Sequence, residues 1–137
     1  MKLGINTHFI MKFGFEEGLK FCQNFELKAV EIAAMGGGAN KYCDVDKLLA
    51  DQGELDRWLD AYASYGLEIY SFAGHGTPLF PDKRIAEEYS REFRQTCKLM
   101  EKIGATRLAL VAGLPEGAEG DSLPVWIINT DLPMFRD

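Results

Sequence analysis

The sequence predicts an α/β fold built from parallel β/α units. Short apolar segments alternate with segments in which apolar residues recur at helical spacing. The connections between the apolar segments are too long for hairpins, so neighbouring strands are expected to run parallel, joined by right-handed crossovers. The chain has 137 residues, the length of a single domain, and residues 113–137 are expected to form a loop-rich tail within it.

Four strands are predicted, and each is short. They are expected at residues 2–6, 29–33, 67–72 and 106–111. The triple glycine Gly36-Gly37-Gly38 ends the second strand and is typical of a mobile loop, because it lacks the spacing of a phosphate-binding motif. Residues 125–128 are apolar enough for a fifth strand, but Pro124 and the flanking residues favour a packed loop.

Helices are predicted between the strands from apolar stripes and end signals. Residues 15–25 form the first, with Glu16 and Glu17 in its first turn, where acids suit the helix dipole. A short helix over residues 48–49 has Asp44 or Asp46 as its cap, and a longer one over 55–65 ends at Gly66. The clearest helix begins after Asp82 and ends at Gly104.

Two architectures fit this pattern: an open doubly wound sheet, or about half of a (β/α)₈ barrel. Glu31 lies between Val30 and Ile32, so it points away from the face that these two residues present to a helix. In an open sheet that second face also lies under a helix, where an unpaired carboxylate is costly. Glu31 therefore favours the barrel, whose interior can admit water or substrate near its top.

Composition and charge narrow the kinds of partner and the location that are expected for the protein. Fifteen basic and 21 acidic residues give a net charge of −6, which disfavours nucleic acids and anionic membrane surfaces. No apolar run is long enough to span a bilayer, and the N-terminus lacks the apolar region of a signal peptide, so a cytoplasmic location is expected. The three cysteines, Cys22, Cys43 and Cys97, are widely spaced and are expected to be reduced thiols.

The candidate site residues lie near the carboxyl ends of the expected strands, where α/β folds place their sites. Asn6 and His8 come at the end of the first strand, Glu31 is in the second, and His75 follows the third. A carboxylate and imidazoles that converge on one rim suit general acid–base chemistry or a divalent metal. The alternative is that the histidines are ordinary loop residues and that Glu31 pairs with a lysine.

The segment Gly74-His75-Gly76-Thr77-Pro78-Leu79-Phe80-Pro81-Asp82, together with the long helix that follows it, resembles the sugar phosphate isomerase/epimerase family. These proteins are xylose isomerase-like TIM barrels, related in fold to endonuclease IV. The segment Ala29-Val30-Glu31-Ile32 resembles the second strand of that family, and Gly120-Asp121-Ser122 with Trp126 resembles its long loop after strand four. The resemblance covers nearly the whole chain but only the N-terminal half of the family's barrel.

The resemblance implies a sugar or sugar-phosphate isomerase/epimerase in which a divalent metal (Mn, Mg or Zn) assists proton transfer next to a carbonyl. The metal ligands of that family lie on strands five to eight, so none is assigned here. Asn6, His8, Glu31, His75 and Trp126 are then expected to bind substrate, while the catalytic residues stay unknown. Where the family often has Asn and a second His, this sequence has Thr77 and Phe80.

Two other functions stay open. One is a truncated half-barrel without catalytic activity, and the other is an endonuclease IV-like phosphodiesterase, which the shortage of histidines and the acidic charge disfavour. A half-barrel would leave the first and fourth strands as unpaired edges. We therefore expect self-association, or a missing C-terminal half that completes the fold.

Overall fold

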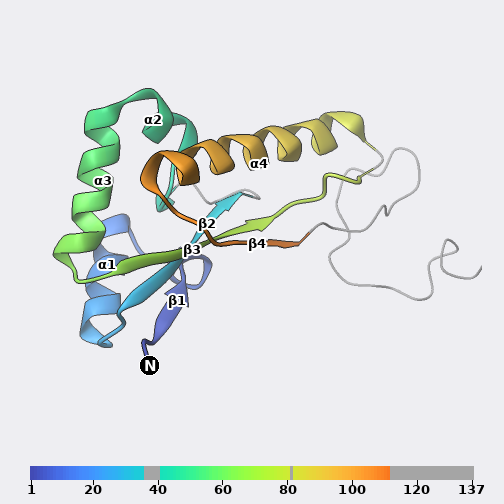
Figure 1. The fold of residues 1–137 in the computed structure, drawn as a ribbon. Coiled ribbons are helices and arrows are strands. Elements are labelled where there is room, and N and C mark those ends of the chain that lie inside the picture. Colours follow the sequence, from blue (N-terminus) through green and yellow to red (C-terminus); the bar gives the residue numbers. More distant parts are fainter. Residues whose placement is uncertain (36–40, 81, 112–137) are drawn as a thin grey trace, which may run out of the picture.

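The computed structural model describes residues 1–35, 41–80 and 82–111, which form a parallel sheet with helices packed on it (Figure 1). The strands are β1 (Gly4–Asn6), β2 (Ala29–Met35), β3 (Glu68–His75) and β4 (Leu108–Val111). The helices are a 3₁₀ turn η1 (Thr7–Ile10) and the α-helices α1 (Phe15–Asn24), α2 (Val45–Ala50), α3 (Gln52–Ser64) and α4 (Lys83–Ile103). No helix of the described residues is long and apolar enough to cross a membrane.

The four described strands pair in the order β1-β2-β3-β4, and every pair is parallel. The order follows the sequence without the reversal that defines a doubly wound sheet. This confirms parallel β/α units and puts β1 and β4 at the edges of the described sheet. The predicted loop-rich tail, residues 113–137, lies outside the described residues, as do Gly36 to Gly38.

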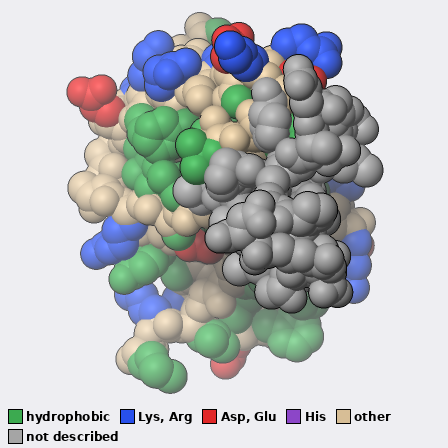
Figure 2. All heavy atoms as spheres, turned by 90° about the vertical axis from the view of Figure 1, so that its right-hand side faces the viewer, with side chains coloured by type: hydrophobic (Ala, Val, Ile, Leu, Met, Phe, Trp, Pro, Cys, Tyr) green, Lys and Arg blue, Asp and Glu red, His purple; other side chains and the backbone are tan. Residues whose placement is uncertain are grey.

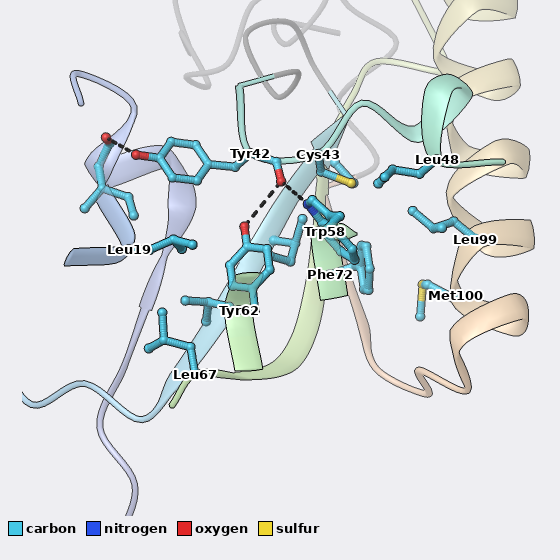
Figure 3. Close-up of a cluster of buried hydrophobic side chains, with 14 of the residues drawn as sticks. Leu19, Tyr42, Cys43, Leu48, Trp58, Tyr62, Leu67, Phe72, Leu99 and Met100 are labelled. Atoms are coloured by element: carbon cyan, nitrogen blue, oxygen red, sulfur yellow. Dashed lines mark hydrogen bonds between the residues drawn. The ribbon is translucent and has the colours of Figure 1, made fainter. Parts of the chain in front are cut away.

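One face of the sheet carries the core. Val30, Ile32 and Phe72 are fully buried on it. They belong to one apolar cluster with residues from the helices α1, α3 and α4, namely Leu19, Cys22, Leu55, Trp58, Tyr62, Leu99 and Met100 (Figure 3). Alternation along β2 therefore turns Glu31 to the other face, as predicted.

Tyr42 ties three segments of this core together (Figure 3). Its hydroxyl donates to the carbonyl of Ile10 at 2.9 Å, and its own carbonyl accepts from Trp58 Nε1 at 2.7 Å and Tyr62 Oη at 3.3 Å. Burial raises the pKa of Tyr42 to about 12, so the hydroxyl keeps the proton that it donates. The buried polar atoms of these aromatic residues are thus satisfied within the protein.

The helix ends follow the predicted signals. Asp44 caps α2 by accepting from Lys47 N, and Asp82 caps α4 by accepting from Arg84 N. Gly104 ends α4 with φ of 73°, a left-handed conformation that a side chain disfavours. Asp51 caps α3 in the same way, by accepting from Glu54 N.

Candidate functional site

A row of three polar side chains crosses the face of the sheet on which none of the described helices packs, called here the helix-free face. The register aligns Asn6 with Glu31 and Glu31 with Ser71. Asn6 Nδ2 donates to Glu31 Oε1 at 2.7 Å, and Ser71 Oγ donates to Glu31 Oε2 at 2.8 Å. Each carboxylate oxygen thus has one protein donor and capacity for another. We call Asn6, Glu31 and Ser71 the polar row.

An irregularity in β3 brings Ser71 into this row. Val30 pairs with Ile69, but the next residue, Glu31, pairs with Ser71. The extra residue, Tyr70, makes a β-bulge, a device that commonly redirects side chains next to functional sites. The Tyr70 ring lies 4.3 Å from the Arg107 guanidinium carbon, in a cation–π contact. Without the bulge, Tyr70 would stand opposite Glu31.

Asn6 is held from the other side by the chain that follows it. Its Oδ1 accepts from the backbone N–H of His8 at 2.8 Å, so Asn6 also caps η1. With the oxygen engaged in this way, the amide nitrogen is left to donate to Glu31. Beyond the end of β1, the buried Thr7 Oγ accepts from Ala33 N at 2.9 Å and continues the contact with β2.

The polar row lies beside an open hollow of about 630 Å³ on the helix-free face. The hollow extends from the row toward the amino ends of the strands, and Tyr70, Glu68 and Lys2 line it. Lys2 and Glu68 form an ion pair there. Glu31 is half-buried, so its carboxylate is accessible from the hollow.

The structure separates the histidines from the polar row. His75 does not follow the third strand, as expected, but is the last residue of β3, because that strand continues through Ala73 and Gly74. Alternation puts His75 on the same face as Ser71, about 13 Å farther along at the usual rise of about 3.3 Å per residue. His8 lies exposed in η1. Asn6 and Glu31 therefore meet, whereas the two histidines lie nearer the rim.

Two predicted features need a further comment. Trp126, the remaining candidate for substrate binding, lies outside the described residues. Ser71 was not predicted as a site residue, because it lies in no nucleophile motif. The signal available in the sequence was a small polar residue within the apolar strand 67–72, but its register against Glu31 depends on the bulge.

No group of three or more His, Cys, Asp or Glu side chains within residues 1–35, 41–80 and 82–111 is arranged to hold a metal ion. The cysteines do not form a site either. All three are free; Cys22 and Cys43 are buried, which raises the pKa of both thiols, and Cys97 is exposed.

Comparisons with known proteins identify a distant relative. The chain matches no protein-family model. It is 23% identical over 130 residues to a protein of Bacillus subtilis (strain 168) described as "Uncharacterized protein YfiH". The match covers 95% of this chain but only 41% of the relative, so the chain spans less than half the length of the protein that it matches.

Proposed function

We propose that this chain is the substrate-binding half of a β/α barrel that acts as a sugar or sugar-phosphate isomerase/epimerase. The observation that carries the proposal is the polar row, a carboxylate held by one donor on each side on the helix-free face of the sheet. In a closed barrel this face would be the interior. The unreversed strand order and the greater length of the relative both support such a barrel.

The chemistry of the polar row suits sugar hydroxyls. Each oxygen of Glu31 has room for one more donor, and two neighbouring hydroxyls of a sugar could each supply one. A phosphate group would be repelled by the same charge, so the phosphorylated end of a substrate would lie away from Glu31. His75, farther along the same face, would bind the part of the substrate near the rim.

In this proposal the described residues bind and orient the substrate. The proton transfer next to the carbonyl would be carried out by groups of the second half, with a metal to polarise the substrate oxygens. Glu31 and His75 are binding groups here, and neither is assigned as the catalytic base.

Binding is testable on this chain by NMR. Ketoses, aldoses and their phosphates are titrated into the ¹⁵N-labelled protein, and we expect saturable shifts of the amides around Glu31 and Ser71. Glu31→Ala is expected to abolish them, whereas Glu101→Ala removes an exposed carboxylate from α4 and is expected to leave them unchanged. The absence of shifts with every sugar would contradict the proposal.

Turnover is tested separately on the longer Bacillus subtilis relative, with Mn²⁺, Mg²⁺ or Zn²⁺ and the same sugars. We expect interconversion of a ketose with its epimer or with an aldose. Sugar binding by this chain combined with an inactive relative would indicate a non-catalytic protein.

A further inference from the structure

A second hollow lies at the opposite end of the sheet, between β4 and the first half of α4. We call it the α4–β4 groove. It has a volume of about 300 Å³, and its wall includes Met35, Tyr89, Phe93 and Leu110. It lies on the helix side of the sheet and does not belong to the hollow beside the polar row. Figure 2 faces the carboxyl ends of the strands and shows a patch of hydrophobic side chains on the part of this surface that the described residues form.

The groove is apolar yet open. Phe93 is 39% exposed and Leu110 is 52% exposed, although both belong to apolar faces of their elements. Glycines form part of its wall, because a side chain at Gly74 would overlap Met35 and one at Gly76 would approach the Tyr89 ring to 2.8 Å. An adjoining set of exposed apolar side chains marks an interaction surface more often than a single one does.

Two polar groups at the groove limit what fits it. Ser90 and Arg94 are at positions i and i+4 of α4, so they lie on the same face of the helix, and both line the groove. Within the described part of the chain, Arg94 has no carboxylate at ion-pairing distance. A guanidinium with a free face pairs best with an indole ring, and a serine hydroxyl can accept from an indole N–H. These groups favour tryptophan over an aliphatic side chain.

The chain itself contains a tryptophan close in sequence to the groove. Val111, the last residue of β4, lines the groove, and residues 112–137 follow it directly. Their longest apolar run is Val125-Trp126-Ile127-Ile128, which contains one of the two tryptophans of the protein. The other, Trp58, is in the core. Because the run is tethered to the rim of the groove, its effective concentration there is far higher than that of a separate molecule.

We propose that the α4–β4 groove is the docking site for Trp126, with the indole against Phe93 and Leu110 and its face toward Arg94. The tail would then shield the helix side of β4. This inference does not depend on the proposed function, since the groove and the polar row lie on opposite faces of the sheet, and it replaces the expectation that Trp126 binds substrate beside Glu31.

Tryptophan fluorescence tests the proposal on the whole chain. The spectrum of Trp126 is obtained as the difference between the wild type and Trp126→Phe, which leaves Trp58 in place. We expect this difference spectrum to be blue-shifted from that of N-acetyltryptophanamide and protected from acrylamide. A spectrum like that of the free indole would overturn the proposal.

Groove variants locate the docking site. Leu110→Asp, or the milder Phe93→Ser if the first does not fold, is expected to shift the Trp126 spectrum to the red and to remove its protection. Leu3→Asp makes the same kind of change at an exposed leucine outside the groove and is expected to have no effect. A blue shift that survives both groove variants, or one that appears only at concentrations where sedimentation shows a dimer, would overturn the proposal.

Discussion

At the scale of single residues, the polar row depends on a few side chains that satisfy one another. Glu31 is half-buried on the sheet and accepts from Asn6 and Ser71, while Asn6 is itself fixed by the backbone of His8. A hydrogen bond to a charged group contributes more to stability than one between neutral groups. The interactions within the polar row should therefore be measurable as a coupling free energy between its residues.

We expect Ser71→Ala to lower the free energy of unfolding by about 1–2 kcal/mol, because it removes one donor from the Glu31 carboxylate. In a Glu31→Ala background the same substitution should cost less, since the acceptor is gone. Urea unfolding of the two single variants and the double variant measures the difference. Ser64→Ala, at an exposed hydroxyl, controls for the change of side chain. Equal costs in both backgrounds would show that the row is not coupled.

Gly18 is a second residue whose role can be tested. It is buried in α1, where alanine would ordinarily favour the helix by roughly 0.5–1 kcal/mol. A side chain there would overlap the Tyr42 hydroxyl, which is held by the carbonyl of Ile10. We expect Gly18→Ala to destabilise the protein by about 1–3 kcal/mol, as overpacking does.

The Gly18 explanation has an internal control. Tyr42→Phe removes the overlapping oxygen, so the penalty of Gly18→Ala should fall in that background. Gly14→Ala, where a side chain meets nothing within 4 Å, involves no overlap and should cost only the preference for glycine over alanine at the N-cap of α1, which is less than the cost of Gly18→Ala. Thermal unfolding of the wild type, the three single variants and the Gly18→Ala/Tyr42→Phe double variant measures these costs, and an undiminished penalty in the Tyr42→Phe background would point to a different contact.

At the scale of elements, the sequence predicted what depends on local signals. α4 was predicted from its apolar stripe, with Asp82 and Gly104 at its ends, and β2 from its apolar run. The carboxyl end of β3 was missed because Ala73 and Gly74 have weak strand propensity; pairing with β4 extends the strand to His75. The bulge at Tyr70 was also missed, because the register depends on how two strands pair and cannot be derived from one strand alone.

The candidate site, like the elements, could be predicted only where it depends on signals within one strand. The orientation of Glu31 followed from alternation within one strand, and Asn6 was placed near it because parallel strands share an edge. Ser71 could not be assigned, because its partner depends on one extra residue in β3. We expected Glu31 and His75 to lie together because they share a face, but alternation specifies only the face and not the position along the strand.

The junction of α2 and α3 carries a pH-dependent contribution. Glu54 lies 3.0 Å from Lys47 Nζ and 2.7 Å from an Arg57 guanidinium nitrogen. The hydrogen bonds from Lys47 and Arg57 lower the pKa of this carboxyl from its usual value of 4.5. A carboxyl whose pKa is lower in the folded state stabilises the protein above that usual value, and the contribution disappears as the pH falls through the lowered pKa.

We therefore expect Glu54→Gln to destabilise the protein near neutral pH and to have progressively less effect as the pH falls below about 4.5. Urea unfolding at several pH values measures the difference between wild type and variant. Glu101→Gln, at an exposed glutamate of α4, controls for the loss of one negative charge. A difference that stays constant, or grows, toward low pH would contradict this assignment.

At the scale of the whole molecule, the described sheet has two edges and one uncovered face. β4 is mostly exposed although its sequence, Leu108-Ala-Leu-Val111, is entirely apolar. The unpaired backbone of such an edge is a template for another strand. Association of the chain with itself or with a complementary half therefore stays a prediction.

We expect sedimentation to show self-association of the isolated chain that increases with concentration. Ala109→Lys puts a charge on the exposed edge strand and should reduce the association. Lys98→Ala, on the exposed surface of α4, should not. A wild-type chain that stays monomeric at all concentrations and unfolds cooperatively would show that the edge strands are protected.

The order of the strands has a consequence for how the protein is made. Each described strand pairs with the strand that precedes or follows it in the chain, so no pairing has to wait for a distant part of the sequence. As the polypeptide leaves the ribosome, β2 can dock on β1, and β3 on β2, before the remainder is synthesised. We expect nascent chains that are arrested once residue 80 has left the ribosome to show protection of β1 and β2 from protease.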